Sequence, residues 1–269
     1  MTTLAAVAVP TGLPETGRVG QVAFSTIGKG LPVTVFAHGL GGSATETRPL
    51  ATRGPGTRVL LSFRGHGDSG PLPLGWDYDL LADDLRAVAD ATGASCAVGL
   101  SLGAGALLRV LSDDPARFDR VAFVLPAAID ATRTDGATLA LQALGDAIDA
   151  SDVDAVTALL MADVPAAVRE RRGVRPLVRR RAEQLSRRSA PRPMRDDRPL
   201  PDRAVLDHVA APALVVGQAA DPLHRLDVAR ELCAALPSAE LLALPEGGVF
   251  WTATREMQHR LAEHLSGAA

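Results

Sequence analysis

The sequence contains little cysteine, few aromatic residues and no long apolar run, and each shortage excludes a class of protein. Its two cysteines, Cys96 and Cys233, lie in an apolar strand-like run and in an expected helix. They are typical of small buried side chains in a reducing compartment, which argues against a disulfide framework. Residues 1–17 lack a basic region and their apolar run is short and broken by prolines, so we expect neither a signal peptide nor a membrane span. The expected location is the cytoplasm, with no membrane partner.

Lysine is almost absent, since Lys29 is the only one and the remaining basic charge is arginine. With 3% aromatic residues, this arginine-rich and alanine-rich composition is typical of a GC-rich bacterial genome and indicates no mechanism. In other respects the composition is that of a globular protein: 269 residues, 47% hydrophobic and 22% charged, with a net charge of −3. Such a chain can bury a large core, and its length fits one domain with an insertion.

Short apolar runs alternate with longer helical patterns, which is typical of a parallel sheet connected by crossover helices. Several runs are apolar at successive positions, as expected of strands covered on both faces. Residues 76–93 illustrate the helical pattern, with apolar side chains at Leu81, Leu85 and Val88 and with Gly93 as a stop signal. The predicted fold class is therefore α/β. The expected strands are 21–28, 31–39, 57–63, 95–101, 120–126, 211–218 and 239–245, and further helices are expected at 223–236 and 254–265.

Residues 130–207 interrupt this alternation, because helical patterns replace the strands there. We expect an α/β core formed by residues 1–129 and 208–269, with a helical, arginine-rich cap formed by residues 130–207. Between residues 169 and 203 the chain has 13 arginines and five acidic residues. This excess is typical either of solvated amphipathic helices or of a surface that attracts an acidic substrate or a carrier protein. We expect no nucleic-acid partner, since the stretch lacks interleaved aromatic residues and the whole chain is negative.

A serine stands at the end of one predicted strand, in the sequence GLSLG at residues 99–103. An apolar strand runs into this G-x-S-x-G pattern and a helical pattern follows at once, which is the context of a nucleophile elbow. So tight a turn leaves no room for Cβ atoms on either side of the serine. Ser101 would then lie at a helix N-terminus, where the helix dipole favours developing negative charge. The alternative is an ordinary serine that caps the helix.

Two further stretches end predicted strands in glycine-rich loops: VTVFAHGLGGS at residues 33–43 and LLSFRGHGDSG at residues 60–70. In their order and spacing, the three motifs resemble those of the α/β-hydrolase superfamily, most closely its small capped esterase, lactonase and perhydrolase-like branch. The resemblance covers about residues 21–130 and 205–265, while the cap has no motif that matches. It implies an α/β-hydrolase fold, with a mostly parallel central sheet flanked by helices and a helical cap insertion.

The resemblance also implies roles for the residues that match. Ser101 matches the nucleophile. The amide of Leu40, or of Gly39, and the amide of Leu102 match the oxyanion hole, and His38 belongs to the same loop. These residues are expected to bind the reacting part of a substrate.

The acid of similar proteins commonly follows the strand after the cap, where this chain has Asp221. Its role would be to fix the tautomer of the histidine and to stabilise the imidazolium without itself taking the proton. A turn-forming Asp-Pro pair before a helix is the structural alternative for Asp221. Asp130, after the preceding strand, is the alternative acid.

The resemblance fails at the catalytic histidine. Similar proteins carry it in the loop after the last strand, usually as a glycine followed by histidine, and this chain has Gly248 and Val249 there. Valine cannot accept a proton. With Phe250 and Trp251, Val249 is instead expected to form an apolar wall of the substrate pocket.

The base must therefore come from another position, or the triad is incomplete. His224 lies three residues after Asp221 at the start of an expected helix, so the two side chains can share one face and form a hydrogen bond. A role confined to the start of that helix is the alternative. His38 and His66 lie at the same end of the sheet, although the resemblance implies that they shape their loops. The remaining histidines are expected at the opposite end of the sheet or on the surface of the last helix: His208, His259 and His264.

Three functions fit these residues. The first is a serine hydrolase acting on an ester, thioester or lactone of a small metabolite, with an atypical or incomplete triad. The second is a non-hydrolytic cyclase or lyase that uses the pocket and the oxyanion hole. The third is a catalytically silent small-molecule binding protein, and fold alone does not choose among the three. We expect no cofactor and no metal, and a substrate that is acidic if cap arginines such as Arg180 or Arg181 face Ser101.

Overall fold

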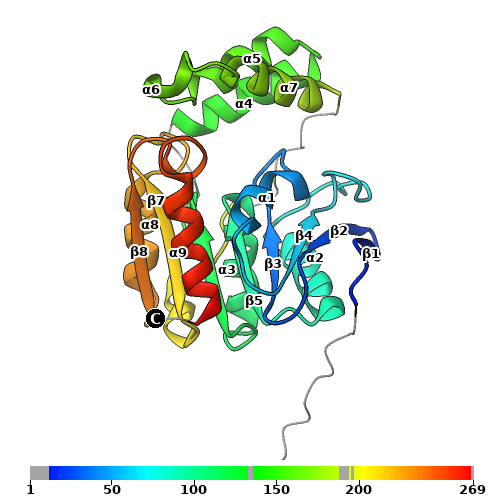
Figure 1. The fold of residues 1–269 in the computed structure, drawn as a ribbon, viewed down its shortest axis with the longest axis vertical. Coiled ribbons are helices and arrows are strands. Elements are labelled where there is room, and N and C mark those ends of the chain that lie inside the picture. The colour runs from blue at the N-terminus through cyan, green and yellow to red at the C-terminus, as the bar shows by residue number, and fades with distance from the viewer. Residues whose placement is uncertain (1–11, 133–135, 188–193, 195–196, 268–269) are drawn as a thin grey trace, which may run out of the picture.

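The computed structural model describes residues 12–132, 136–187, 194 and 197–267, and its centre is an eight-stranded sheet (Figure 1). The strand order is β1-β2-β4-β3-β5-β6-β7-β8, and the two strands at the β1 edge are antiparallel to their neighbours. All other neighbours are parallel. The sheet is therefore mostly parallel, as predicted. The strands are β1 (Thr16–Val19), β2 (Val22–Ile27), β3 (Val33–Ala37), β4 (Thr57–Ser62), β5 (Cys96–Leu100), β6 (Arg120–Val124), β7 (Ala213–Gln218) and β8 (Ala239–Leu244).

Helices cover both faces of the sheet, because the central strands are apolar on both sides. All residues of β3 and β5 are buried. In β5, Ala97 packs into one apolar cluster, while Cys96 and Val98 pack into the other. Side chains of α2 (Tyr78–Thr92), α3 (Leu102–Asp113) and α8 (Leu226–Ala235) complete the first cluster. Side chains of α1 (Ala44–Ala51) and α9 (Thr254–Ser266) complete the second.

Each of the seven expected strands is present, and β1 is a further strand that the sequence did not predict. Its four residues, TGRV, contain glycine and arginine and carry no apolar repeat. They form a strand because they pair antiparallel with β2 at the edge of the sheet. Pairing with a neighbour, and not local sequence preference, therefore defines this element.

The region between β6 and β7 contains helices joined by loops, and no strand is found among its described residues. The helices are α4 (Gly136–Asp149), α5 (Val153–Ala162), α6 (Ala166–Arg169), α7 (Val174–Ser186) and the short 3₁₀ helix η1 (Arg203–His208). We call α4 to α7 the cap helices. Figure 1 shows them grouped beyond the end of the sheet at which β3 leads into α1. The boundaries of the cap at residues 130 and 207 stay a prediction, and residues 133–135, 188–193 and 195–196 lie outside the described part.

Within the described ranges, no helix combines the length and the apolar character that crossing a bilayer requires.

Candidate active site

Ser101 lies in a strained turn between β5 and α3. Its φ of 50° and ψ of −108° place a residue with a side chain in a backbone region that such residues avoid. A Cβ at Gly99 would come 2.4 Å from the carbonyl oxygen of Gly103, and one at Gly103 would come 2.4 Å from that of Ala37. The two glycines of the G-x-S-x-G pattern are thus required by close backbone approach, as expected for an elbow.

His224 connects Ser101 to Asp221. Its Nε2 lies 2.9 Å from the hydroxyl oxygen of Ser101, and its Nδ1 lies 3.1 Å from Oδ2 of Asp221. His224 and Asp221 both lie in the segment between β7 and α8. The side chains of His224 and Asp221 are 16% and 10% exposed, so the contact is largely shielded from water. Of the candidate bases, His224 is the one that the structure brings to Ser101.

The carboxylate of Asp221 is held by four donors. Its Oδ1 accepts the backbone amides of Leu223 and His224, each at 2.9 Å. Its Oδ2 accepts Nε2 of Gln218 at 2.7 Å in addition to the imidazole. Burial acts to raise the pKa of Asp221, but the hydrogen bonds and charge of His224 together with the Gln218 amide hold it below its ordinary value. Asp221 is therefore an anion at neutral pH.

The loop after β8, where similar proteins carry the histidine, packs here against the apolar core and the cap helices. Val249 is fully buried among apolar side chains that include Leu244 and Met257. Its backbone amide donates to Oε1 of Gln218 at 3.1 Å. Trp251 packs against the apolar cluster of the cap helices. The loop therefore supports Asp221 through Gln218 instead of supplying a base.

The glycine-rich loop after β3 runs beside Ser101. A Cβ at Gly39 would lie 3.4 Å from Cβ of Ser101. The amide of Gly39 already donates to Oε2 of Glu46 at 2.9 Å, which leaves the amide of Leu40 as the donor that this loop can offer an oxyanion. The other expected donor, the amide of Leu102, begins α3 directly after the serine.

His38 and His66 are engaged by backbone groups at both ring nitrogens. Nε2 of His38 accepts the amide of Phe63 at 3.0 Å, and its Nδ1 lies 2.7 Å from the carbonyl oxygen of Gly39. Nε2 of His66 accepts the amide of Gly41 at 3.1 Å, and its Nδ1 lies 3.0 Å from the carbonyl oxygen of Arg64. A neutral imidazole in this arrangement has no lone pair left for a proton from serine. Both residues shape their loops.

The remaining acid and histidine candidates lie elsewhere. Asp130 pairs with Arg203 at 2.6 Å, and this contact lowers the pKa of the Asp130 carboxyl. His259 is exposed, as expected, and His208, which precedes β7, is exposed as well. His264 differs from the expected surface position, because it is partly buried with Nε2 2.9 Å from the carbonyl oxygen of Val121, and burial lowers its pKa.

Arginines of the cap helices point in different directions. Nη2 of Arg181 donates to the carbonyl oxygen of Gly41 at 2.8 Å and lies 3.4 Å from Oε1 of Glu46. Its neighbour Arg180 is exposed. Burial raises the pKa of Glu46, while the charges of Arg181 and His224 and the Gly39 amide act to lower it. Sequence reasoning did not single out Glu46 or Gln218, although a polar residue at the carboxyl end of a buried strand is a signal that could have identified Gln218.

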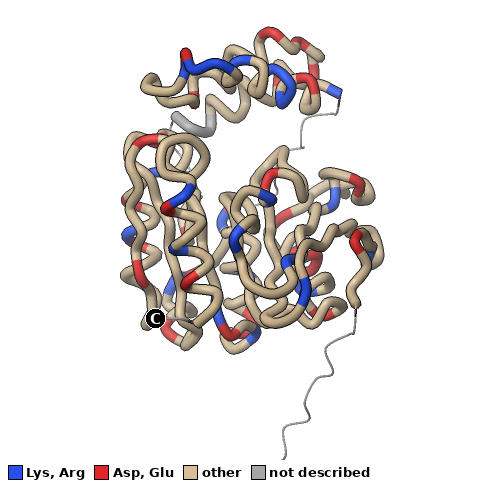
Figure 2. The backbone as a smooth tube through the Cα atoms, viewed as in Figure 1, with Lys and Arg blue, Asp and Glu red and all other residues tan. Residues whose placement is uncertain are grey.

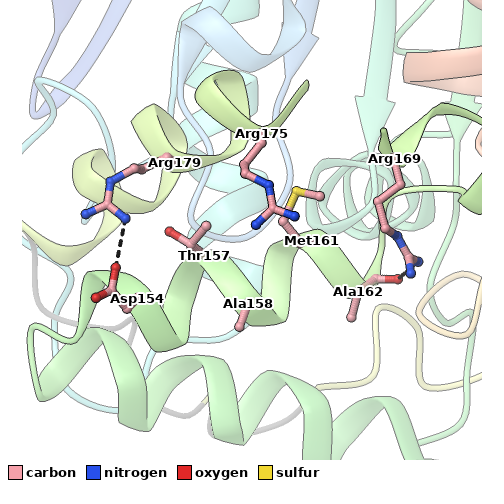
Figure 3. A pocket seen from close by; sticks show the side chains of 8 residues that line it. All are labelled: Asp154, Thr157, Ala158, Met161, Ala162, Arg169, Arg175 and Arg179. Atoms are coloured by element: carbon pink, nitrogen blue, oxygen red, sulfur yellow. Dashed lines mark hydrogen bonds and ion pairs between the residues drawn. The ribbon is translucent and has the colours of Figure 1, made fainter. Parts of the chain in front are cut away.

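Further cap arginines line a separate groove between α5 and α7. Figure 3 shows Arg169, Arg175 and Arg179 above the small and apolar side chains of α5. The groove has a volume of about 500 Å³, and its lining includes neither Ser101 nor His224. Arg179 pairs there with Asp154 at 2.8 Å. Figure 2 shows the run of basic residues along this part of the cap.

Solved structures of hydrolases share this arrangement of elements. A serine hydrolase from the polyaromatic hydrocarbon-degrading bacterium Cycloclasticus zankles is 16% identical, with a TM-score of 0.76 over 94% of this chain and 97% of that one. A meta-cleavage product hydrolase from Pseudomonas fluorescens is 16% identical, with a TM-score of 0.75 over 95% and 99%. An esterase from Exiguobacterium antarcticum is 17% identical, with a TM-score of 0.70 over 91% and 95%. At these identities the likeness shows the fold.

Family membership follows from the sequence itself. The model of the "Alpha/beta hydrolase family" matches residues 34–264, which include the elbow at Ser101, the loop after β3 and the segment that carries Asp221 and His224. This chain belongs to the α/β hydrolase family.

Proposed function

We propose that the chain is a serine hydrolase that cleaves an ester, thioester or lactone bond of a small metabolite. The observation that carries the proposal is the continuous hydrogen-bonded series from Asp221 through His224 to Ser101. Nucleophile, base and orienting acid stand within hydrogen-bond reach of one another, which is the arrangement that acyl transfer needs. In this proposal the triad is atypical in the position of its base and not incomplete.

The chemistry follows the roles of a triad. As the hydroxyl oxygen of Ser101 attacks the carbonyl carbon, Nε2 of His224 takes its proton, and Asp221 stabilises the imidazolium. The amides of Leu40 and Leu102 bind the oxyanion. The imidazolium then gives its proton to the leaving oxygen or sulfur. Water attacks the acyl-enzyme, with His224 as base, and the acid and free Ser101 are released.

In this proposal the acid and the base lie close together in the sequence, so that their relative orientation is set locally. Asp221 and His224 share one turn, and Oδ1 of Asp221 accepts the backbone amide of His224 while Oδ2 faces its ring. The relative orientation of acid and base is therefore set within four residues. In a triad whose histidine lies after β8, two separate loops must be aligned.

The two alternative functions use less of this geometry. A cyclase or lyase that needs only positioning and an oxyanion hole has no need of an imidazole bonded to the serine. A silent binding protein has no need of the strained turn at Ser101. We further propose a cytoplasmic location, a reaction without cofactor and an acidic substrate, the last because residues 169–203 carry 13 arginines and five acidic residues.

The test is labelling by a fluorophosphonate probe, measured as intact mass. Wild type is expected to gain one label per chain, Ser101→Ala none, and His224→Ala is expected to label at least about 10³-fold more slowly. His208→Ala, at an exposed histidine, is the matched control and should label like the wild type.

Two outcomes would contradict the proposal. Absence of labelling in the folded wild type would mean that Ser101 is not activated, and the alternative functions would then be favoured. Labelling of His224→Ala at the wild-type rate would show that the contact between His224 and Ser101 has no role as a base.

A further inference from the structure

The loop that carries Leu40 is held on both sides of that residue. On one side the amide of Gly39 donates to Oε2 of Glu46 at 2.9 Å. On the other side the carbonyl oxygen of Gly41 accepts Nη2 of Arg181 at 2.8 Å, and the amide of Gly41 donates to His66. These contacts hold the residues on either side of Leu40, whose backbone amide would donate to an oxyanion.

The direction of the Leu40 amide follows from its peptide plane. The carbonyl oxygen of Gly39 accepts the amide of Gly42 at 3.0 Å and lies 2.7 Å from Nδ1 of His38. In a planar trans peptide the N–H points opposite to the carbonyl oxygen, so these contacts direct the Leu40 amide away from His38 and Gly42. Any rotation of the loop at Gly39 or Gly41 would turn that amide.

Arg181 is the contact that comes from the cap. Its guanidinium reaches Gly41 and the carboxylate of Glu46, which itself holds Gly39, so one side chain of α7 acts on both sides of Leu40. A Cβ at Gly41 would lie 3.3 Å from Leu185, one turn further along α7. The cap helix therefore touches the loop through a charged contact and an apolar one.

The loop needs such contacts because of its composition. Gly39, Gly41 and Gly42 give the backbone wide conformational freedom, and Gly41 has a φ of 68°. A charge-assisted hydrogen bond to a carbonyl oxygen is among the stronger polar contacts available to fix a flexible segment. The side chain of Arg181 is 30% exposed, so this bond is partly shielded from water.

We propose that Arg181 is a positioning residue, which holds the oxyanion loop in its active shape and makes activity depend on docking of the cap helices. The inference rests on the proposed hydrolase function for its kinetic consequence. Its structural part, the attachment of the loop by the cap, stands on the contacts of Arg181 alone.

The test compares Arg181→Ala with Arg180→Ala. Both variants remove one arginine from neighbouring positions of α7, but Arg180 is exposed and makes no contact with the loop among the described residues. Because loss of an oxyanion donor lowers kcat by about 10²–10³-fold, a donor that is present but misdirected is expected to cost about 10-fold. For a p-nitrophenyl ester, Arg181→Ala should lower kcat by about this factor while KM changes less than about twofold. Arg180→Ala should leave both unchanged.

Amide hydrogen exchange of the peptide covering residues 39–42 supplies a readout that needs no activity. Exchange there should be faster in Arg181→Ala than in Arg180→Ala. Arg181→Lys, which keeps a charged donor, should recover most of the kcat. If Arg181→Ala is unfolded, Glu46→Gln, which removes the charge that Arg181 faces, should accelerate exchange in the same peptide.

The outcomes distinguish a failure of the proposal for Arg181 from a failure of the proposed function. If Arg181→Ala matches Arg180→Ala in kcat and in exchange, the proposal is wrong. If the wild type neither labels nor hydrolyses esters, the proposed function fails, and the exchange comparison alone then supports or overturns the attachment of the loop by Arg181.

Discussion

Replacement of Asp221 by asparagine tests the proposed triad most sharply, because every partner of the carboxylate is a donor. Oδ1 accepts two backbone amides, and Oδ2 accepts Gln218 and faces Nδ1 of His224. In asparagine the oxygen has to stay with the two amides, so the new NH₂ group faces two further donors. Gln218 cannot turn over to accept it, because its Oε1 already accepts the amide of Val249.

The conflict is relieved if the imidazole of His224 changes its tautomer. Nδ1 then accepts from the asparagine, and Nε2 carries the proton toward Ser101. In that state the ring has no lone pair for the serine proton, although the heavy atoms have hardly moved. Loss of the correct tautomer in a serine triad lowers kcat by about 10⁴-fold, which corresponds to about 5.4 kcal/mol of transition-state stabilisation.

The assay is steady-state hydrolysis of p-nitrophenyl butyrate by the wild type and Asp221→Asn, with Asp227→Asn as control. Asp227 carries the same charge at the start of α8, but its side chain is 59% exposed and pairs only with surface arginines among the described residues. We expect kcat to fall about 10⁴-fold in the first variant and to stay unchanged in the second. A loss below about 10-fold in a folded Asp221→Asn would refute the role of Asp221 in orienting His224.

Three further predictions follow from packing and titration. Gly99→Ala places a Cβ 2.4 Å from a backbone oxygen of the following helix, so urea unfolding should show a loss of at least about 1–3 kcal/mol. Burial holds the pKa of His264 below its ordinary value of 6.5, so the unfolded state binds more protons and the free energy of unfolding should rise with pH up to that value. Substitution His264→Gln should flatten this rise. Val249→His added to His224→Ala should restore less than about tenfold of the lost ester hydrolysis, because position 249 is buried in the core; recovery of 100-fold or more would contradict that placement.

The buried strands could be predicted because their apolar sequence matches the apolar surroundings in which they lie. Residues 35–37 and 96–98 are apolar at successive positions, and both faces of their strands are covered by helices. β1 could not be predicted, since its pairing with β2 gives it strand structure that its own residues do not favour. Local pattern therefore identifies the buried strands and misses the edge.

For the candidate site, the sequence predicts residues but not which of them meet. The elbow at Ser101 and the acid at Asp221 follow from motifs, and the spacing of Asp221 and His224 permits their contact. That spacing does not show that the ring reaches across to Ser101, 123 residues away in the chain. The contact between Arg181 and Glu46 joins positions 135 residues apart and has no local signature.

In the proposed triad His224 is the base, which would explain why the loop after β8 lacks the histidine expected there. If His224 takes the proton of Ser101, as proposed, the loop after β8 needs no base. Val249 is buried there, and its backbone amide donates to Oε1 of Gln218. The same loop is free to pack against the cap: a Cβ at Gly247 would come 2.0 Å from Pro165, and Trp251 joins the apolar cluster of the cap helices. The backbone amide at position 249 therefore helps to hold the side chain of Asp221 in place through Gln218.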